Sequence, residues 1–254
     1  MSEVAISFRN VSKAFAGRRT VVAIGDLSFD VRTGEYVCIV GRTGCGKSTT
    51  IGLLLGLEKP SGGNVSVFGC DPFRQFDALR GKIGCVFQSD RLLPWRSAID
   101  NIRVPIEIIG LDERRLQQKP TQWLDRLGLR AFENAYPHEL SGGMRQRVAL
   151  ARALVSDPKI LLADEAFGHL DEVTGDELRR DFHRLAKESG KTVLHVTHSI
   201  DEAITLSDRI LVFGRPGHVA ADIAIPRVRD SRLREEIFRH IENSERDAAG
   251  AVAA

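Results

Sequence analysis

Residues 36–48 read YVCIVGRTGCGKS, an apolar run of strand length that passes directly into a glycine-rich loop. The loop, Gly41–Ser48, has the spacing Gly-x4-Gly-Lys-Ser, and a helical pattern follows from Lys47 to Leu57. In this order of strand, loop and helix, glycines let successive backbone N–H groups turn inward around an anion, and the helix N-terminus adds its dipole. A chance glycine-rich turn would not need all of these features together. The stretch therefore predicts a phosphate-binding loop in an α/β protein.

The side chains of this loop suit a bound nucleotide, so ATP and Mg²⁺ are the predicted ligands. Lys47 is placed to reach the β- and γ-phosphates, and the hydroxyl of Ser48 is placed to coordinate Mg²⁺. Cys45 lies at the start of the predicted helix, which predicts a lowered thiol pKa and a reactive side chain whose alkylation would block ATP binding. The predicted nucleotide-binding residues of the loop are Gly41, Arg42, Thr43, Gly44, Cys45, Gly46, Lys47, Ser48 and Thr49.

The size and charge of the chain limit its organisation and its partners. Its 254 residues, 43% of them hydrophobic, fit one large domain with an embedded subdomain better than two independent domains. Lys and Arg number 36, Asp and Glu number 34, and the net charge is +2. A chain so evenly charged shows no signal for anionic lipid or nucleic acid, and we expect no nucleic-acid partner.

Strand and helix patterns alternate along the chain as in a parallel α/β protein. Leu27, Phe29 and Val31 alternate with polar residues, as in a half-buried strand. Between about Ser89 and Pro158 the strand patterns give way to helical ones, so a mostly helical block is inserted into the α/β core. The predicted strands are Tyr36–Val40, Asn64–Phe68, Ile83–Phe87, Ile160–Ala163, Thr192–Thr197 and Arg209–Phe213, and the inserted block has predicted helices at Thr121–Leu127 and Arg145–Leu154.

The chain has no apolar run close to the roughly 20 residues that span a bilayer, and its start lacks the pattern of a secretory signal. The four cysteines form no CxxC pair or other metal-ligand spacing, which suits a reducing compartment. We therefore expect a cytosolic location.

A second motif, ILLADE at residues 160–165, is an apolar strand that ends in two carboxylates. Asp164 would hold Mg²⁺ through water, and Glu165 could polarise the attacking water as a general base. Two acids after a strand often mark only the start of a helix. Beside a phosphate-binding loop, the catalytic interpretation is favoured.

A third motif, LSGGMRQR at residues 140–147, resembles the signature sequence of the ABC ATPases. Other elements of that family follow in the expected order. Phe15 resembles the aromatic residue that stacks on adenine, and Gln88 matches the glutamine of the Q-loop. Residues 168–171 match the D-loop, and His198 matches the switch histidine. The resemblance covers nearly the whole chain, from about residue 4 to residue 225.

The resemblance implies a P-loop NTPase (RecA-like) core with an N-terminal antiparallel β subdomain and an inserted α-helical subdomain at about 89–158. The ATPase domain would be residues 1–225, followed by a helical tail, 226–254. It also implies a head-to-tail homodimer, in which each ATP lies between one copy's phosphate loop and the other copy's signature segment. A second anion site is plausible there, because a hydroxyl and backbone N–H groups meet at a helix N-terminus. The residues concerned are Ser141, Gly142 and Gly143.

The remaining roles are implied by the same resemblance. His198 would contact the γ-phosphate and orient Glu165 and the water, Gln88 would sense Mg²⁺, and Asp171 would reach across the dimer. The catalytic candidates are thus Glu165, His198 and Lys47, and the metal candidates are Ser48, Gln88 and Asp164.

Three positions depart from the common family pattern. Met144 stands where many members have glutamine, although one branch of importers shares this form. Ala166 replaces a proline after the catalytic glutamate, which would loosen the turn there. His169 occupies a D-loop position that is usually small, which affects packing across the dimer.

Three kinds of ABC protein are compared: the energy subunit of an importer, a soluble ABC ATPase, and an exporter motor. The chain has one set of motifs, no long coiled coil and no membrane-spanning run. These features favour the importer subunit, and the soluble ABC ATPase stays as the alternative. Residues 91–102, after Gln88, look like the matching stretch of nitrate, sulfonate and taurine importers, as does the segment Arg215–Gly217.

The importer interpretation implies further partners. Integral membrane permease subunits would contact Gln88–Ile102, where an exposed Leu-Pro-Trp could receive a helix of the permease. Trp95 could instead pack inside the helical subdomain. An extracytoplasmic solute-binding protein would act indirectly, and the subunit would lie peripherally on the cytoplasmic side of the cell membrane. The solute itself stays open among nitrate, sulfonate, taurine and related small molecules.

Overall fold

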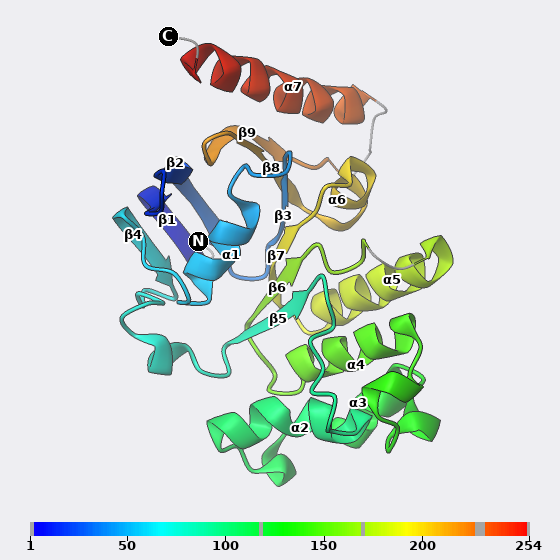
Figure 1. Ribbon diagram of the computed structural model, residues 1–254. Coiled ribbons are helices and arrows are strands. Elements are labelled where there is room, and N and C mark those ends of the chain that lie inside the picture. The colour runs from blue at the N-terminus through cyan, green and yellow to red at the C-terminus, as the bar shows by residue number, and fades with distance from the viewer. Residues whose placement is uncertain (1–2, 117–118, 169–170, 227–231, 253–254) are drawn as a thin grey trace. The chain divides into compact units, whose positions relative to one another are not determined.

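The structure is a computed structural model that describes residues 3–116, 119–168, 171–226 and 232–252 (Figure 1). The chain divides into two compact units. One unit consists of Met1–Leu79 and Thr192–Ala254, and the other of Arg80–Lys191. The label of each element below is that of Figure 1.

The first unit contains a three-stranded antiparallel sheet in the order β2-β1-β4. Phe8 lies opposite both Phe29 and Val65, and the rings of Phe8 and Phe29 stack with centroids 4.6 Å apart. The predicted alternation is confirmed, since Leu27, Phe29 and Val31 are buried while their polar neighbours are half-buried or exposed. The strands are β1 (Val4–Phe15), β2 (Val21–Arg32) and β4 (Gly62–Val67).

The first unit also contains strands that run parallel to one another, with β3 between β7 and β8. All residues of β3 and β7 are buried, as expected for parallel strands covered on both faces. Helix α1 ends three residues before the predicted Leu57, because Gly56 turns the chain with φ 68° and leaves Leu57 exposed. The elements are β3 (Tyr36–Val40), α1 (Lys47–Leu54), η1 (Phe76–Leu79), β7 (Thr192–Val196), α6 (Ile200–Leu206), β8 (Arg209–Gly214), β9 (His218–Ala224) and α7 (Arg232–Val252).

Two features of this unit were not predicted in detail. Strand β9 pairs antiparallel with β8, and the sequence analysis did not identify it. Helix α7 covers much of the predicted tail and buries Leu233 and Ile237, so this helix has an apolar side against protein. Residues 227–231, within the same predicted tail, lie outside the described residues.

In the second unit, β5 pairs in parallel with β6. Helices α2 to α4 lie between these two strands in the chain, and α5 follows β6. Ser97 caps α2, and Gly110, with φ 69°, ends it. Helix α4 begins three residues before the predicted Arg145, because Ser141 supplies its N-cap. The elements are β5 (Ile83–Phe87), α2 (Ala98–Ile109), η2 (Glu113–Arg115), α3 (Pro120–Arg126), η3 (Arg130–Phe132), η4 (Pro137–Glu139), α4 (Gly142–Leu154), β6 (Ile160–Asp164) and α5 (Glu172–Glu188).

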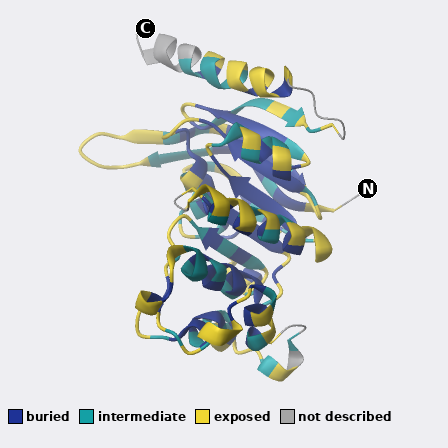
Figure 2. Cartoon of the chain, turned by 90° about the vertical axis from the view of Figure 1, so that its right-hand side faces the viewer, coloured by how far each residue is buried: buried dark blue, intermediate teal, exposed yellow. Residues whose placement is uncertain are grey.

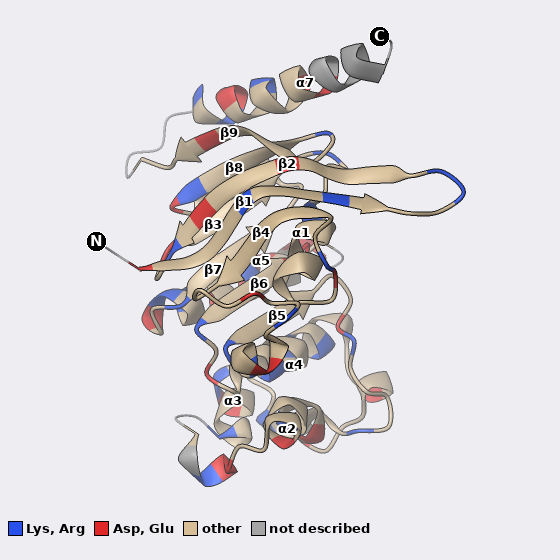
Figure 3. Ribbon diagram, turned by 90° about the vertical axis from the view of Figure 1, so that its left-hand side faces the viewer, with Lys and Arg blue, Asp and Glu red and all other residues tan. Residues whose placement is uncertain are grey.

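Buried residues and charged residues are distributed differently between the strands and the helices. Figure 2 shows the inner strands largely in the dark blue of buried residues, whereas β9 and the hairpin end of β1 and β2 are teal or yellow. Figure 3 shows strands that are largely tan, while most charged residues lie on helices and connecting segments. In the described part of the chain, no helix combines the length and the apolar character that crossing a membrane requires.

Candidate functional site

The phosphate loop connects β3 to α1 and is held by its own lysine. Lys47 is only 6% exposed, and its ammonium donates to the carbonyl oxygens of Gly41 at 2.7 Å and Arg42 at 3.2 Å. Gly46 has φ 90°, and a Cβ there would lie 2.8 Å from the carbonyl oxygen of Ala23, so only glycine fits. The loop therefore keeps the cation at its centre in a fixed backbone frame.

The outer part of the loop is accessible. Arg42, Thr43, Gly44 and Ser48 are exposed and Thr49 is half-buried, so the hydroxyl of Ser48 can meet a ligand. The guanidinium of Arg42 forms an ion pair with Glu245 of α7 at 3.0 Å, which joins the C-terminal helix to the loop.

The structure corrects the prediction for Cys45. Its side chain is 1% exposed, and burial raises the pKa of the Cys45 thiol, while the charges of Lys47 and Arg215 only partly oppose this effect. The predicted lowering of this pKa was wrong, because the cost of desolvating the thiolate outweighs the stabilisation from the neighbouring cations and backbone N–H groups.

This correction gives a prediction for thiol chemistry. In the native protein at neutral pH, Cys45 will react with iodoacetamide about tenfold or more slowly than the half-buried Cys70, because a buried thiol with a raised pKa holds little thiolate. Peptide mass spectrometry over a time course measures both rates. Unfolding in urea should bring the two rates together, and faster labelling of Cys45 in the native protein would contradict the prediction.

His198 lies at the same sheet edge as the phosphate loop. It follows β7, which is parallel to β3 with Val196 beside Ile39, so the carboxyl ends of both strands meet at one edge. His198 is exposed, and Thr197 before it is buried with its N–H donating to the carbonyl of Ile39 at 3.1 Å. The structure thus brings His198 and the loop to one side of their unit.

A buried polar network supports the turn at His198, and sequence analysis missed it. Glu202 accepts a hydrogen bond from the hydroxyl of Thr197, and that hydroxyl accepts from the N–H of Ser199 at 3.1 Å. Beneath them, Nδ1 of the fully buried His195 lies 3.2 Å from the hydroxyl of Tyr36. In the sequence, Glu202 three residues after Ser199 indicates only a capping box.

Phe15 stands at the end of β1 and is 38% exposed, so it is not a core residue. The ammonium of Lys13 lies 4.7 Å from the centroid of its ring. The cation therefore covers part of the ring, and the rest of this exposed side chain is accessible to a ligand.

In the second unit, three predicted residues meet at the ends of β5 and β6. Phe87 pairs in register with Asp164, so Gln88 and Glu165 both leave the sheet at the same point. The amide of Gln88 donates to a carboxylate oxygen of Glu165 at 3.5 Å, and Glu165 has a left-handed backbone with φ 48°.

The turn after Glu165 is anchored without a proline. Ala166 is 2% exposed, and its carbonyl accepts a hydrogen bond from the side chain of Gln146 at 2.7 Å. The looser turn expected at Ala166 is therefore countered by an amide that the sequence analysis did not identify.

The signature segment opens α4. The hydroxyl oxygen of Ser141 accepts from the N–H of Met144 at 3.3 Å, so Met144 contributes its backbone to this cap. Ser141 and Gly142 are exposed, and a Cβ on Gly143 would lie 2.4 Å from Cγ2 of Thr174, so any larger residue there would force the Thr174 side chain to move.

The predicted D-loop is described only in part. Asp171 caps α5, accepting from the N–H of Thr174 at 3.0 Å, and this backbone contact lowers the pKa of the Asp171 carboxyl. Gly168 is exposed. His169 and Leu170 lie outside the described residues.

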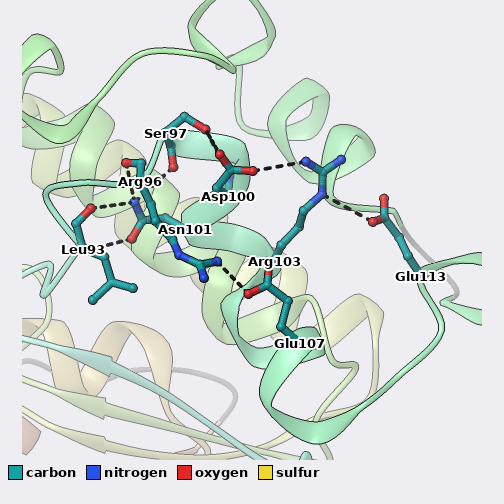
Figure 4. Close-up of polar contacts among 8 residues, drawn as sticks. All are labelled: Leu93, Arg96, Ser97, Asp100, Asn101, Arg103, Glu107 and Glu113. Carbon is teal, nitrogen blue, oxygen red and sulfur yellow. Dashed lines mark hydrogen bonds and ion pairs between the residues drawn. The ribbon is translucent and has the colours of Figure 1, made fainter.

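Residues 91–97 form a turn before α2 that presents Trp95. Trp95 is 71% exposed, so it does not pack inside the helical part of its unit, whereas Trp123 is buried. The buried amide of Asn101 holds this turn (Figure 4). Its Nδ2 donates to the carbonyls of Leu93, Arg96 and Ser97 at 3.2, 2.9 and 3.0 Å, and its Oδ1 accepts from the N–H of Leu93 at 2.8 Å.

Comparison with known proteins gives these motifs a family. Residues 24–168 match the family described as ABC transporter. The taurine import ATP-binding protein TauB of Rhizobium johnstonii is 40% identical over 87% of this chain and 84% of its own. The aliphatic sulfonates import ATP-binding protein SsuB of Pseudomonas fluorescens is 39% identical over 90% of this chain and 81% of its own. The nitrate import ATP-binding protein NrtC of Synechococcus elongatus is 42% identical over 75% of this chain, and the matched stretch is 29% of the length of NrtC.

A solved structure agrees with these relatives. The ATP-binding cassette MJ0796, in a dimeric post-hydrolysis state bound to ADP and Pi, has a TM-score of 0.76 and 32% identity over 88% of this chain and 100% of its own. The fold is therefore the P-loop NTPase fold, with the antiparallel β sheet and inserted helices expected from the sequence. The chain belongs to the ABC transporter family, as an ATPase cassette.

Proposed function

We propose that this chain is the energy-coupling subunit of an ABC importer for a small solute of the nitrate, sulfonate or taurine kind. The observation that carries the proposal is the exposed Trp95 on a turn shortly after Gln88, in a cassette whose relatives are import ATP-binding proteins. Two copies would work head-to-tail under separate membrane permease subunits at the cytoplasmic side of the membrane. A solute-binding protein outside the membrane would deliver the cargo.

In this proposal the phosphate loop binds ATP and Phe15 stacks on the adenine. The buried ammonium of Lys47 neutralises phosphate charge, and the exposed ends of the loop meet the β- and γ-phosphates. Ser141 and Gly143 of a second copy would complete the site. This sandwich makes ATP the link between copies, and its hydrolysis releases them.

The chemistry would be general-base hydrolysis. Glu165 removes a proton from the water that attacks the γ-phosphorus while the bond to the ADP oxygen breaks, and the amide of Gln88 lies 3.5 Å from that carboxylate. His198 holds the γ-phosphate, and Asp171 contributes from the second copy. Bound Mg²⁺ would neutralise charge on the phosphates.

The donor set of this chain fits Mg²⁺. The ion prefers oxygen ligands, keeps several waters and takes few protein ligands beside substrate phosphates. Ser48 offers an exposed hydroxyl, Asp164 a carboxylate at the end of a strand and Gln88 an amide oxygen. Among the described residues no group of three or more His, Cys, Asp or Glu gathers as an all-protein cage, which agrees with a site shared with phosphate.

The importer role is tested at Trp95. In vesicles containing the permease, Trp95→Ala should lower solute uptake about tenfold or more, because a central aromatic anchor carries a large share of an interface's energy. Basal ATPase activity of the isolated subunit should stay unchanged, since the side chain is exposed. Ile108→Ala, at another exposed apolar residue of the same unit, serves as the matched control.

Two outcomes would contradict this proposal. Normal uptake by the Trp95→Ala subunit would remove its coupling role. A subunit that never co-purifies with a membrane permease would favour the soluble ABC ATPase instead.

A further inference from the structure

Gln146 is a buried amide that contacts two of the motifs described above. It lies in α4 and is 4% exposed. Its Nε2 donates to the carbonyl oxygen of Phe87 at 3.0 Å and to that of Ala166 at 2.7 Å. Phe87 immediately precedes Gln88, and Ala166 immediately follows Glu165. One side chain thus holds the backbone beside both members of the Gln88–Glu165 pair.

The direct contact between these two side chains is weak. The amide of Gln88 and the carboxylate of Glu165 are 3.5 Å apart, at the long limit of a hydrogen bond. The backbone that carries the two side chains therefore contributes to their separation. The two bonds of Gln146 are shorter, and the one to Ala166 is buried, where a hydrogen bond is electrostatically stronger than in water.

The backbone at Glu165 needs such support. Its φ of 48° is a left-handed conformation, which residues with a side chain adopt rarely and keep only when the surroundings hold it. The bond from Gln146 to the next carbonyl supplies a restraint at this point.

The same helix also holds the chain on the far side of Gln88. Arg145 donates to the carboxylate of Asp90 at 3.0 Å, and Arg152 donates to the carbonyl oxygens of Arg91 and Asp90 at 2.8 and 2.6 Å. Gln88 and Ser89 therefore lie between two points fixed by α4. The N-terminus of that helix is the signature segment, so three motifs share one rigid element.

We propose that Gln146 is a positioning residue for ATP hydrolysis, which keeps Gln88 and Glu165 in their working arrangement and ties that arrangement to the signature helix. It touches neither water nor phosphate in this role and acts through its two carbonyl partners. The inference rests on the proposed function of Glu165 as the general base.

The test is Gln146→Met, which keeps the length and burial of the side chain and removes both donors. We expect the single-turnover rate constant for ATP hydrolysis to fall about tenfold to a hundredfold, the size that small misplacements of reacting groups cost. The affinity for ATP and the number of ATP bound per folded chain should stay as in the wild type, because the phosphate loop is untouched. A rate constant measured on bound ATP does not depend on how much of the sample is folded.

The control is Gln122→Met, the same chemical change in α3. Gln122 is exposed, and its side chain accepts one hydrogen bond, from the N–H of Lys119 at 2.7 Å. This variant should hydrolyse ATP like the wild type. If Gln146→Met does not fold, Gln146→Asn keeps the amide but cannot reach both carbonyls, and it should show the same loss of rate.

A double-variant cycle separates this inference from the function on which it rests. If Glu165→Gln removes turnover and Gln146→Met adds no further loss in that background, the two residues act as a unit, as proposed. If a folded Gln146 variant hydrolysed ATP at the wild-type single-turnover rate, the positioning role of Gln146 would be wrong, and the general-base role of Glu165 would stand. Normal turnover by Glu165→Gln would instead show that Glu165 is not the general base, and Gln146 would then have no catalytic group to position.

Discussion

Glu165→Gln will reduce ATP turnover about 10²- to 10⁴-fold while ATP still binds, because it removes a general base but keeps the shape of the side chain. Glu165 follows the end of β6, and its carboxylate accepts from the amide of Gln88. It lies outside the phosphate loop, Gly41–Ser48, so its replacement leaves that loop intact. Phosphate release measures the loss, and equilibrium dialysis with ATP measures the binding. Because hydrolysis would no longer separate the two copies, sedimentation should show an ATP-dependent dimer.

The control for this experiment is Glu188→Gln, at the exposed C-terminal end of α5, where the carboxylate pairs only with other surface groups such as Arg126. This variant should turn over ATP normally and should not accumulate as a dimer. Wild-type turnover by the Glu165 variant would reject Glu165 as the base.

Lys47→Met will weaken ATP binding about tenfold to a hundredfold and abolish measurable hydrolysis, since hydrogen bonds to charged groups contribute about 1.5–3 kcal/mol each. The side chain of Lys47 is buried and its ammonium lies at the carbonyls of Gly41 and Arg42, from where it would meet bound phosphates from inside the loop. Methionine fills the space of the lysine side chain without its charge. Titration of ATP followed by calorimetry measures the affinity.

Lys59→Met, at an exposed position after α1, makes the same exchange outside the loop and should bind ATP as the wild type does. Thermal unfolding of both variants shows whether the loop itself has been lost, because Lys47 also donates hydrogen bonds to Gly41, Arg42 and Cys45 of the loop. A stable Lys47 variant with unchanged affinity would contradict the assigned role.

The sequence predicted the strands that carry the site better than it predicted the environment of single side chains. Strands β3 and β5 have the bounds expected from their apolar runs, because glycine or a polar residue marks each end. Strand β9 was missed because its residues are half-buried or exposed and lack a long apolar run. Sequence patterns report such local features well.

Contacts between distant residues explain the other differences. A helix terminus is visible at Cys45 in the sequence, but the burial that raises its pKa is not. The partners of Gln146 lie 59 and 20 residues away, so no local spacing points to its role. Trp95 and Trp123 are equally apolar in the sequence, yet only the folded chain shows that the first is exposed and the second buried.

The complete burial of β3 and β7 has a consequence for interpreting inherited or selected variants of this protein. These strands carry the phosphate loop and His198, but none of their own residues is exposed. A polar side chain in place of Val37, Ile39 or Leu194, each fully buried, would lose its contacts with water and act on the amount of folded protein. Loss of transport from such a variant would therefore report low abundance, whereas a change a few residues further on, in the loop or at His198, would report altered chemistry.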